Sequence, residues 1–488
     1  MFDRLIQAVL SEEVGHVPVQ LEKIPNACVL YRSVGAGNAL PSTRHAWRLA
    51  RSEGDGVCTT TTSGLADRYG GSGIGRNGGS GRNVVIGKVQ IKGVGRTTLV
   101  SPETPASHAS GGAYLEECMR EAIFSGVVAH DFPYGAIPVQ EILDTGECQS
   151  WPDPIQPAQE RRVLLVRPLF VRPAHFERAL GFDFPRRQQA RADHDRVAAV
   201  LERSASILGA DAFVTLLDNF WPKWAHQLAY GFVHRLSHGN DTSSNISVDG
   251  RLLDFGAASA LPSWANAASS YFHDPVVTRF NCIAQAIRST SYYIGRHLGW
   301  LLRRPADVER KIKQCAESFR RALVFEVLRL AGLPDPLAFD VVTGPRREAA
   351  MFAVRAAIDD AQRVRLDLLE PTPMGHVAWP LAKLWEREPP DSVRLLRGFL
   401  QPLIGRSLRE DCQQTHARLS RTRSELFKPH LRQSIFQAID LENDGYLGAT
   451  ASFVQAFVDG HITRGLRERA PAAADPTRVI ASFVSSPR

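Results

Sequence analysis

The chain has few of the features that mark a secreted or zinc-stabilised protein. Its 488 residues include seven cysteines, an odd number, and no two of them form a Cys-x-x-Cys pair. A disulfide framework needs paired cysteines, and a zinc site needs closely spaced ligands, so neither is expected. The cysteines are expected to be reduced.

Long apolar runs are also missing. A membrane-spanning helix needs about 20 consecutive apolar residues, and the chain has no such run. Residues 1–4, Met-Phe-Asp-Arg, do not begin a basic segment followed by an apolar one, so no signal peptide is expected. We therefore expect a cytoplasmic protein without a membrane partner.

The charge is only weakly unbalanced. Lysine and arginine number 58 against 51 aspartates and glutamates, for a formal net charge of +7. The arginines are spread over predicted helices, which favours solvated helix faces with some attraction for polyphosphate. No specific nucleic-acid partner is expected. With 44% hydrophobic residues the chain can bury a large core.

The most informative segment is residues 238–256. It begins His-Gly-Asn-Asp-Thr-Ser-Ser-Asn and ends Asp-Phe-Gly, which places Asn245 nine residues before Asp254. An amide oxygen and a carboxylate are the ligands with which kinase-like folds hold Mg²⁺ against nucleotide phosphates. Between them, two β-prone runs flank Asp249-Gly250, a strong hairpin signal. The segment predicts a hairpin that brings both ligands to one Mg²⁺ or Mn²⁺ ion.

The usual catalytic base is missing from this segment. Kinases carry an aspartate two residues after the histidine, and that position is Asn240 here. A general base needs a carboxylate or imidazole within reach of the reacting hydroxyl. The nearest carboxylate is that of Asp241, which becomes the candidate base. The alternative for the whole segment is an ordinary surface hairpin with a polar loop.

A glycine-rich segment lies upstream, over residues 57–95. It contains Gly79 and Gly81-Arg82 and leads into residues 83–92, a stretch that reads as one strand. A glycine loop beside a strand allows the backbone to approach phosphates closely. A disordered linker would have a similar composition, so both interpretations stay open.

Residues 113–129 have helical spacing and carry Glu121. A lysine at the end of a strand, Lys92, and a glutamate on the next helix can form the ion pair that orients a kinase lysine toward phosphates. Strands are expected at residues 137–143 and 162–166, with a turn at 144–147. The alternative is that Lys92 and Glu121 are ordinary surface charges.

Two arginines follow the second of these strands. Arg167 and Arg172 are each followed by proline at the end of the strand, where they could clamp phosphate oxygens. They could equally be solvent-exposed arginines. Beyond them the pattern is mostly helical.

Strands followed by helices predict an α+β, bilobal, protein-kinase-like fold. We expect residues 1–170 to form a strand-rich N-lobe with an N-terminal extension and the glycine-rich loop. Residues 171–400 should form a helical C-lobe that contains the metal hairpin. Residues 401–488 should form a C-terminal helical extension.

With these residues in view, the chain resembles the selenoprotein O family of kinase-fold pseudokinases. Residues 89–97, Val-Gln-Ile-Lys-Gly-Val-Gly-Arg-Thr, are similar to that family's Leu-Gln-Leu-Lys-Gly-Ala-Gly-Arg-Thr. Residues 119–121 are similar to its Ile-Arg-Glu, and residues 69–83 resemble its glycine loop. Residues 238–256 keep its spacing of His-Gly, Asn and Asp-Tyr-Gly. The similarity covers about residues 57–260.

Members of that family bind ATP inverted relative to ordinary kinases and transfer AMP to hydroxyl groups of proteins. The resemblance implies that Lys92, paired with Glu121, contacts the phosphates. It also implies that Arg167 and Arg172 hold the inverted nucleotide, although they lie two residues closer together than the family's arginines. ATP, Mg²⁺ and a protein or peptide acceptor are the implied partners.

Two departures from the family affect the expected chemistry. The family's catalytic aspartate, directly before the metal asparagine, is Ser244 here, and a family arginine is Glu116. A carboxylate acceptor needs no base, because a pKa of about 4 leaves it ionised. We expect AMP transfer to protein hydroxyls first. The alternatives are adenylating activation of a peptide carboxylate in natural-product (microcin-type) maturation, and a nucleotide-binding pseudokinase scaffold.

Overall fold

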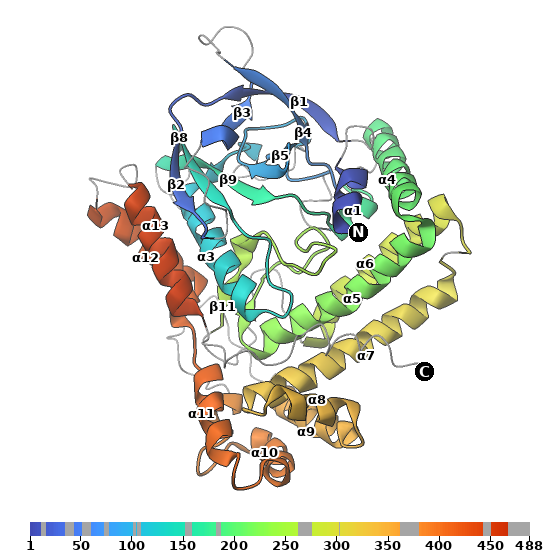
Figure 1. Cartoon of the computed structure of the whole chain (residues 1–488), viewed down its shortest axis with the longest axis vertical. Helices are drawn as coiled ribbons and strands as arrows, with labels where there is room; N and C mark the ends of the chain where they lie inside the picture. Colours follow the sequence, from blue (N-terminus) through green and yellow to red (C-terminus); the bar gives the residue numbers. More distant parts are fainter. Residues whose placement is uncertain are drawn as a thin grey trace.

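The computed structural model describes residues 1–10, 16–34, 43–50, 60–72, 78–100, 104, 109–151, 159–181, 187–261, 276–301, 303–361, 380–442 and 450–466. The protein is of mixed α/β type, with an antiparallel sheet from the first third of the chain and helices from the rest (Figure 1). None of the helices in these ranges is long and apolar enough to cross a membrane. Residues 57–59 and 73–77 of the glycine-rich segment lie outside the ranges.

Within the described residues the main sheet has nine strands, all paired antiparallel, and it curls into a half-barrel. The strand order is β2-β8-β9-β6-β5-β4-β1-β3, and β7 also pairs with β9. The strands are β1 (Val17–Lys23), β2 (Cys28–Arg32), β3 (Trp47–Leu49), β4 (Thr61–Ala66), β5 (Asn83–Ile86), β6 (Val89–Lys92), β7 (Ala113–Tyr114), β8 (Glu141–Ser150) and β9 (Gln159–Pro168). A separate two-stranded pair joins β10 (Leu236–Ser237) to β11 (Ser259–Ala260).

The segment predicted as a single strand at residues 83–92 is a hairpin instead. Strands β5 and β6 pair antiparallel from Asn83 opposite Lys92 to Ile86 opposite Val89. Gly87 has a φ of 55° and occupies the first position of the two-residue turn, where hairpin geometry favours a positive φ. The alternating pattern continued across the turn and so concealed it.

The turn predicted at residues 144–147 is also wrong, because the chain does not reverse there. Strand β8 continues through it, and the register against β9 shifts between Asp144 and Glu147. Gly146 has a φ of 73°, and its N–H donates to Oδ1 of Asp144 at 3.1 Å. The extra residues form a β-bulge, which uses the same residue types as a turn.

Helix α3 (Leu115–Asp131) lies between the sheet and the helical part of the molecule (Figure 1). The apolar stripe predicted for it is buried, including Leu115, Met119 and Ile123. It belongs to one continuous core with Val163 of β9 and with Trp221 and other aromatic residues of the helical part. Because α3 is covered on nearly every side, its charged side chains are held in a dry environment.

The helical part follows β9 and includes several long helices. Helix α5 packs against α7, and the two run side by side in Figure 1. The helices of this part of the molecule are α4 (Arg187–Leu208), α5 (Ala210–Val233), α6 (Val276–Leu298), α7 (Pro305–Leu330), α8 (Asp335–Thr343), α9 (Arg347–Ala361), α10 (Asp391–Ile404) and α11 (Arg409–Leu419).

The N-terminal helix packs against the helical part of the molecule, and the last described helices pack against α3 and the sheet. Helix α1 (Phe2–Val9) packs against α4, and Leu5 joins a core with Val197 of that helix. Helices α12 (Lys428–Glu442) and α13 (Ala451–Gly465) pack against α3, and α13 also covers β2 (Figure 1). The C-terminal helices therefore contact the helix that carries Glu121.

Candidate functional site

Lys92 lies at the centre of a buried group of carboxylates. Its Nζ is 2.8 Å from Oε1 of Glu117, 2.8 Å from Oε2 of Glu121 and 3.2 Å from Oδ1 of Asp254. Lys92 and Glu121 are each only 1% exposed. The predicted Lys92–Glu121 ion pair is therefore present, and Asp254 reaches the same ammonium group.

The fold fixes both sides of this cluster. Lys92 ends β6 and is paired with Asn83 on one side and Leu165 on the other, so its backbone is held within the sheet. Glu117 and Glu121 are four residues apart on α3 and therefore project from the same face of the helix. That face is turned toward Lys92.

Attraction between these charges outweighs the cost of burying them. Burial lowers the pKa of Lys92, but Asp254 and Glu117 raise it more, so the pKa of the ammonium lies above its ordinary value. Burial raises the pKa of Asp254, but Lys92 and Arg167 hold that pKa well below its usual range. These groups are thus charged at neutral pH.

Arg167 is buried beside this cluster and is only partly paired. Its Nη1 donates to Oε1 of Glu121 at 2.9 Å, and the side chain is 1% exposed. Its Nε and Nη2 have no hydrogen-bond acceptor within the described part of the chain. A buried donor without an acceptor costs about 1–3 kcal/mol. These two nitrogens can therefore donate to an anion.

Arg172 is fully buried between the glycine-rich segment and the residue-244 loop. Its Nη1 donates to the backbone oxygen of Ser244 at 2.7 Å, and its Nη2 to Oδ2 of Asp67 at 3.3 Å. The guanidinium carbon lies 4.3 Å from the ring centre of Tyr69. Its Nε has no acceptor among the described residues.

Behind Arg172 lie His16, Asp67 and His175, three buried side chains whose ligand atoms are within 4.8 Å of one another. The backbone N–H of Arg172 donates to Nδ1 of His175 at 3.0 Å, so the proton of this imidazole is on Nε2, which donates to Oδ1 of Asp67 at 3.1 Å. Both ring nitrogens of His175 are thus used. Gln90 also donates to Asp67, at 2.5 Å. The group is better explained as a hydrogen-bond network that positions Arg172 than as a metal site.

The predicted hairpin brings Asn245 and Asp254 toward each other. The N–H of Leu253 donates to the backbone oxygen of Asn245 at 3.0 Å, and Ile246 forms a bridge with Leu252. The turn contains Gly250, with a φ of 99°. The hairpin is short, because only one bridge forms, but it places the two candidate ligands at its open end.

The donors of this hairpin fit a hard divalent cation. The Nδ2 of Asn245 donates to a backbone oxygen at 3.0 Å, which identifies Oδ1 as its coordinating atom. The Asp254 side chain is 29% exposed and uses only Oδ1 in its contact with Lys92. Glu117 and Glu121 also approach Asp254, but the Lys92 ammonium lies among these carboxylates. Asn245 and Asp254 are therefore the better pair for Mg²⁺.

The candidate phosphate-binding glycines have local packing roles. A Cβ on Gly79 would lie 2.6 Å from the backbone oxygen of Asp67, and one on Gly81 would lie 2.3 Å from Val100. Arg82 is buried and pairs with Glu117 at 2.8 Å, so it supports α3. Contact of these residues with a nucleotide stays a prediction.

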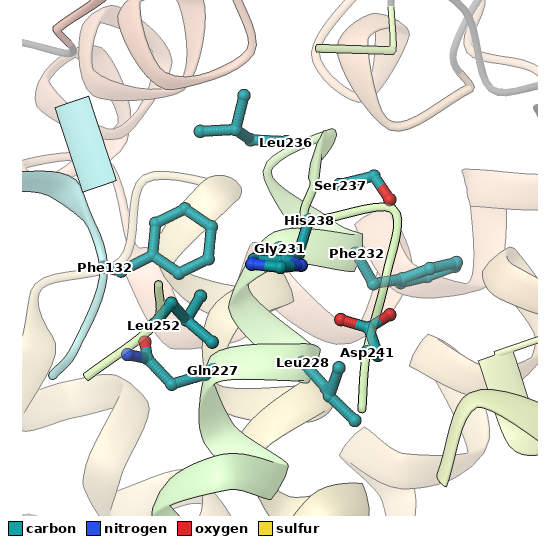
Figure 2. A pocket seen from close by; sticks show the side chains of 10 residues that line it. All are labelled: Phe132, Gln227, Leu228, Gly231, Phe232, Leu236, Ser237, His238, Asp241 and Leu252. Carbon is teal, nitrogen blue, oxygen red and sulfur yellow. The ribbon is translucent and has the colours of Figure 1, made fainter. Parts of the chain in front are cut away.

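Asp241, the candidate base, lines a small pocket beside the end of α5. It has no hydrogen bond or ion pair within the described residues, and so none with Lys92, Arg172 or Asn245. Figure 2 shows its carboxylate among side chains of α5 and of the strand that follows. The other residues lining the pocket are Phe132, Gln227, Leu228, Gly231, Phe232, Leu236, Ser237, His238 and Leu252. The role of Asp241 as the general base stays a prediction, and its place in this pocket does not support that role.

Several residues of the site have little signal in the sequence. Glu116, which stands where the resembled family has an arginine, pairs with Arg120 on the next turn of α3. Nη1 of Arg120 donates to the backbone oxygen of Gly256 at 2.9 Å, which ties α3 to the Asp-Phe-Gly segment. Glu117 could have been suggested by its spacing from Glu121. Asp67 lies within the glycine-rich segment, directly after β4, and had no such signal.

No protein-family model matches the chain, and no curated protein matches it. The function is therefore inferred from the geometry of these residues and from the chemistry that their charges support.

Proposed function

We propose that the chain is a bilobal, protein-kinase-like enzyme that binds Mg-ATP between its sheet and its helices and transfers AMP to a protein hydroxyl group. The observation that carries this proposal is the incomplete pairing of two buried arginines. Arg167 shares Glu121 with Lys92, and Arg172 lies within electrostatic reach of Asp254. Each arginine has N–H groups without an acceptor in the described part of the chain. Phosphate oxygens satisfy such guanidinium groups well.

AMP transfer requires an electrophilic α-phosphorus, a neutralised pyrophosphate and an aligned nucleophile. Lys92, Arg167 and Arg172 provide fixed positive charge for the first two requirements. Asn245 and Asp254 would hold Mg²⁺, which supplies further charge neutralisation when bound. The Glu121 carboxylate, shared by Lys92 and Arg167, fixes the direction of both cations.

A carboxylate acceptor is the second candidate, and Ser244 favours it. The residue directly before Asn245 carries a hydroxyl, which lies 2.8 Å from that of Thr242 and cannot act as a strong base. A carboxylate nucleophile is already ionised at neutral pH and needs none. The product would then be an acyl adenylate.

The proposal is tested by incubating the protein with Mg-ATP carrying the label at either the α or the γ phosphate. We expect labelled protein or peptide product from the α label alone. Lys92→Met and Asp254→Asn should abolish it. Asp249→Asn is the matched control, because Asp249 lies in the same hairpin and its carboxylate pairs with Arg251 at the turn.

Each other outcome has a distinct meaning. Transfer of only the γ label would indicate ordinary kinase chemistry, and ATP binding without any transfer would indicate a scaffold. Release of the label by hydroxylamine would identify an acyl adenylate. Full labelling by Asp254→Asn would contradict the metal assignment.

A further inference from the structure

One buried carboxylate near the Asn245 segment takes no part in the ion pairs described above. Glu177 follows the 3₁₀ turn η4 (Pro173–Phe176) and is 5% exposed. Its Oε1 has no hydrogen-bond partner within the described residues, and its neighbours are the hydroxyls of Ser243 and Ser289. Burial of an incompletely bonded carboxylate is costly, and such groups concentrate at functional sites.

Glu177 lies where the glycine-rich segment meets the loop before Asn245. The N–H of Gly71 donates to the backbone oxygen of Arg178 at 3.0 Å. A Cβ on Gly71, which has a φ of 82°, would lie 2.6 Å from Oγ of Ser243 and 3.6 Å from Oε1 of Glu177. The hydroxyl and the carboxylate therefore both pack against Gly71, where any larger side chain would displace the Ser243 hydroxyl.

Ser243 lies on the segment that lacks the expected base, and Glu177 contacts it from the end of η4. Ser243 directly precedes Ser244, whose backbone oxygen is held by Arg172. Asp241, the other nearby carboxylate, lines a pocket against α5. We infer that Glu177 accepts, through the Ser243 hydroxyl, the proton that is released when an acceptor hydroxyl attacks ATP. This inference rests on the proposed function.

A bond forms between the acceptor oxygen and the α-phosphorus, and the bond from that phosphorus to the pyrophosphate oxygen breaks. Pyrophosphate leaves with the bonding electron pair. The acceptor proton passes to Oγ of Ser243 as the Ser243 proton passes to Glu177. Because Glu177 acts through Ser243, it is a positioning residue for proton transfer.

The surroundings of Glu177 suit a proton acceptor at neutral pH. Burial raises the pKa of Glu177 to about 7, against the smaller lowering by Ser243, Ser289 and Arg196. Arg196 of α4 donates to the backbone oxygen of Glu177 at 2.6 Å, and Tyr293 of α6 also lies within its electrostatic reach. A base whose pKa is near the working pH is the most efficient.

The test is the pH dependence of AMP transfer by Glu177→Gln. In the unaltered protein, kcat should rise tenfold per pH unit up to about pH 7 and then level off. Glu177→Gln should lower kcat about 100-fold or more, lose this rising limb and keep the same KM for ATP. Ser243→Ala should show the same loss of kcat and of the rising limb, with an unchanged KM for ATP. Ser289→Ala should move the limb to higher pH, because it removes a hydroxyl that lowers the pKa of Glu177.

The control is Glu160→Gln, which alters another buried glutamate with a raised pKa, one bonded to Trp151. It should leave kcat and the pH profile unchanged. Folding of Glu177→Gln is checked by its Tm. Folded Glu177 binds an extra proton between pH 4.5 and 7, so its contribution to stability falls as pH rises through that window. The variant should therefore melt no lower than the unaltered protein at pH 8.

A wild-type kcat and pH profile in Glu177→Gln would overturn the inference, and a carboxylate acceptor would give this result. If that variant failed to fold, Glu177→Asp would decide. If Glu177→Asp has a lower kcat that still rises with pH, the result supports Glu177 as the proton acceptor. If its kcat no longer rises with pH, the result overturns the inference. Absence of α-label transfer by the unaltered protein would instead overturn the proposed function. If Asp254→Asn abolishes AMP transfer but Glu177→Gln transfers AMP as the unaltered protein does, only the inference about Glu177 is overturned, and the proposed function stands.

Discussion

At the scale of single residues, pairing distinguishes the arginines of the site from those on the surface. Arg288 forms an ion pair with Glu309 at 3.0 Å while both side chains are 55% exposed, and such pairs contribute little. Arg167 is 1% exposed and has two nitrogens without an acceptor among the residues that the structure describes. Its full set of hydrogen bonds is expected only when a ligand is bound.

Replacing Arg167 by Met should therefore weaken Mg-ATP binding. A hydrogen bond to a charged group contributes about 1.5–3 kcal/mol, which corresponds to roughly 10- to 150-fold in Kd. Isothermal titration calorimetry measures this change. Arg288→Met is the control and should bind as tightly as the unaltered protein. Equal affinity of the two variants would contradict the assignment of Arg167 to the phosphates.

At the scale of secondary-structure elements, α3 is held by the C-terminal helices. Nη1 of Arg423 is 2.7 Å from Oδ2 of Asp131 at the end of α3, and both side chains are almost fully buried. A Cβ on Gly126 would lie 2.5 Å from Ile462, which shows how closely α13 approaches α3. Gln455 of α13 exchanges two hydrogen bonds with the backbone of Arg32 in β2. These contacts fix the helix that carries Glu117 and Glu121.

Replacing Arg423 by Met should loosen α3, because it removes the guanidinium from the buried carboxylate of Asp131. Breaking a buried pair in this way costs about 3–5 kcal/mol. We expect a lower Tm, faster hydrogen exchange in α3 and weaker AMP transfer. The double variant with Asp131→Leu should recover part of the stability.

Arg421→Met is the matched control for this prediction. Arg421 lies two residues away, and its side chain is 47% exposed where it pairs with Glu425. Its replacement should change the Tm little. Equal losses in the two variants would show that the Arg423–Asp131 pair does not hold α3.

Elements were predicted well where periodicity is local. The helix expected at residues 113–129 is α3, because a 3.6-residue apolar period survives even in a buried helix. The bulge at Gly146 and the turn at Gly87 were misread. Both depend on which strand pairs with which, and glycine with a positive φ suits a turn and a bulge equally.

At the scale of the whole molecule, carboxylates paired with cations connect segments that lie far apart in the chain. Asp67 is buried and Glu117 is partly buried, yet Arg172 and Arg82 hold their pKa values well below the usual range. Glu326, on α7, is fully buried, and its pKa is also held low although burial opposes this. Each carboxylate stabilises the fold only while it is ionised.

The protein should therefore lose stability in acid. A carboxylate with a depressed pKa contributes stability above the unfolded pKa of about 4, and this contribution is lost as pH falls below it. Thermal unfolding followed from pH 7 to pH 3 should show a steep fall in Tm below about pH 4.5. The Asp67→Asn variant should have a lower Tm at pH 7 and a shallower fall. A constant Tm down to pH 3 would contradict this account.

The sequence by itself determined the strands followed by helices, the short hairpin of Asn245 and Asp254, and the pairing of Lys92 with Glu121. The first two depend on local spacing, which the order of residues records directly. The pairing was expected from the order of a lysine at a strand end and a glutamate on the next helix. Only the tertiary structure shows that Arg167 is buried with two nitrogens that have no acceptor among the described residues, and that Glu177 lies against Ser243. It also placed α13 against α3. Such contacts join segments far apart in the chain, and their partners are chosen by packing and burial, which no local pattern encodes.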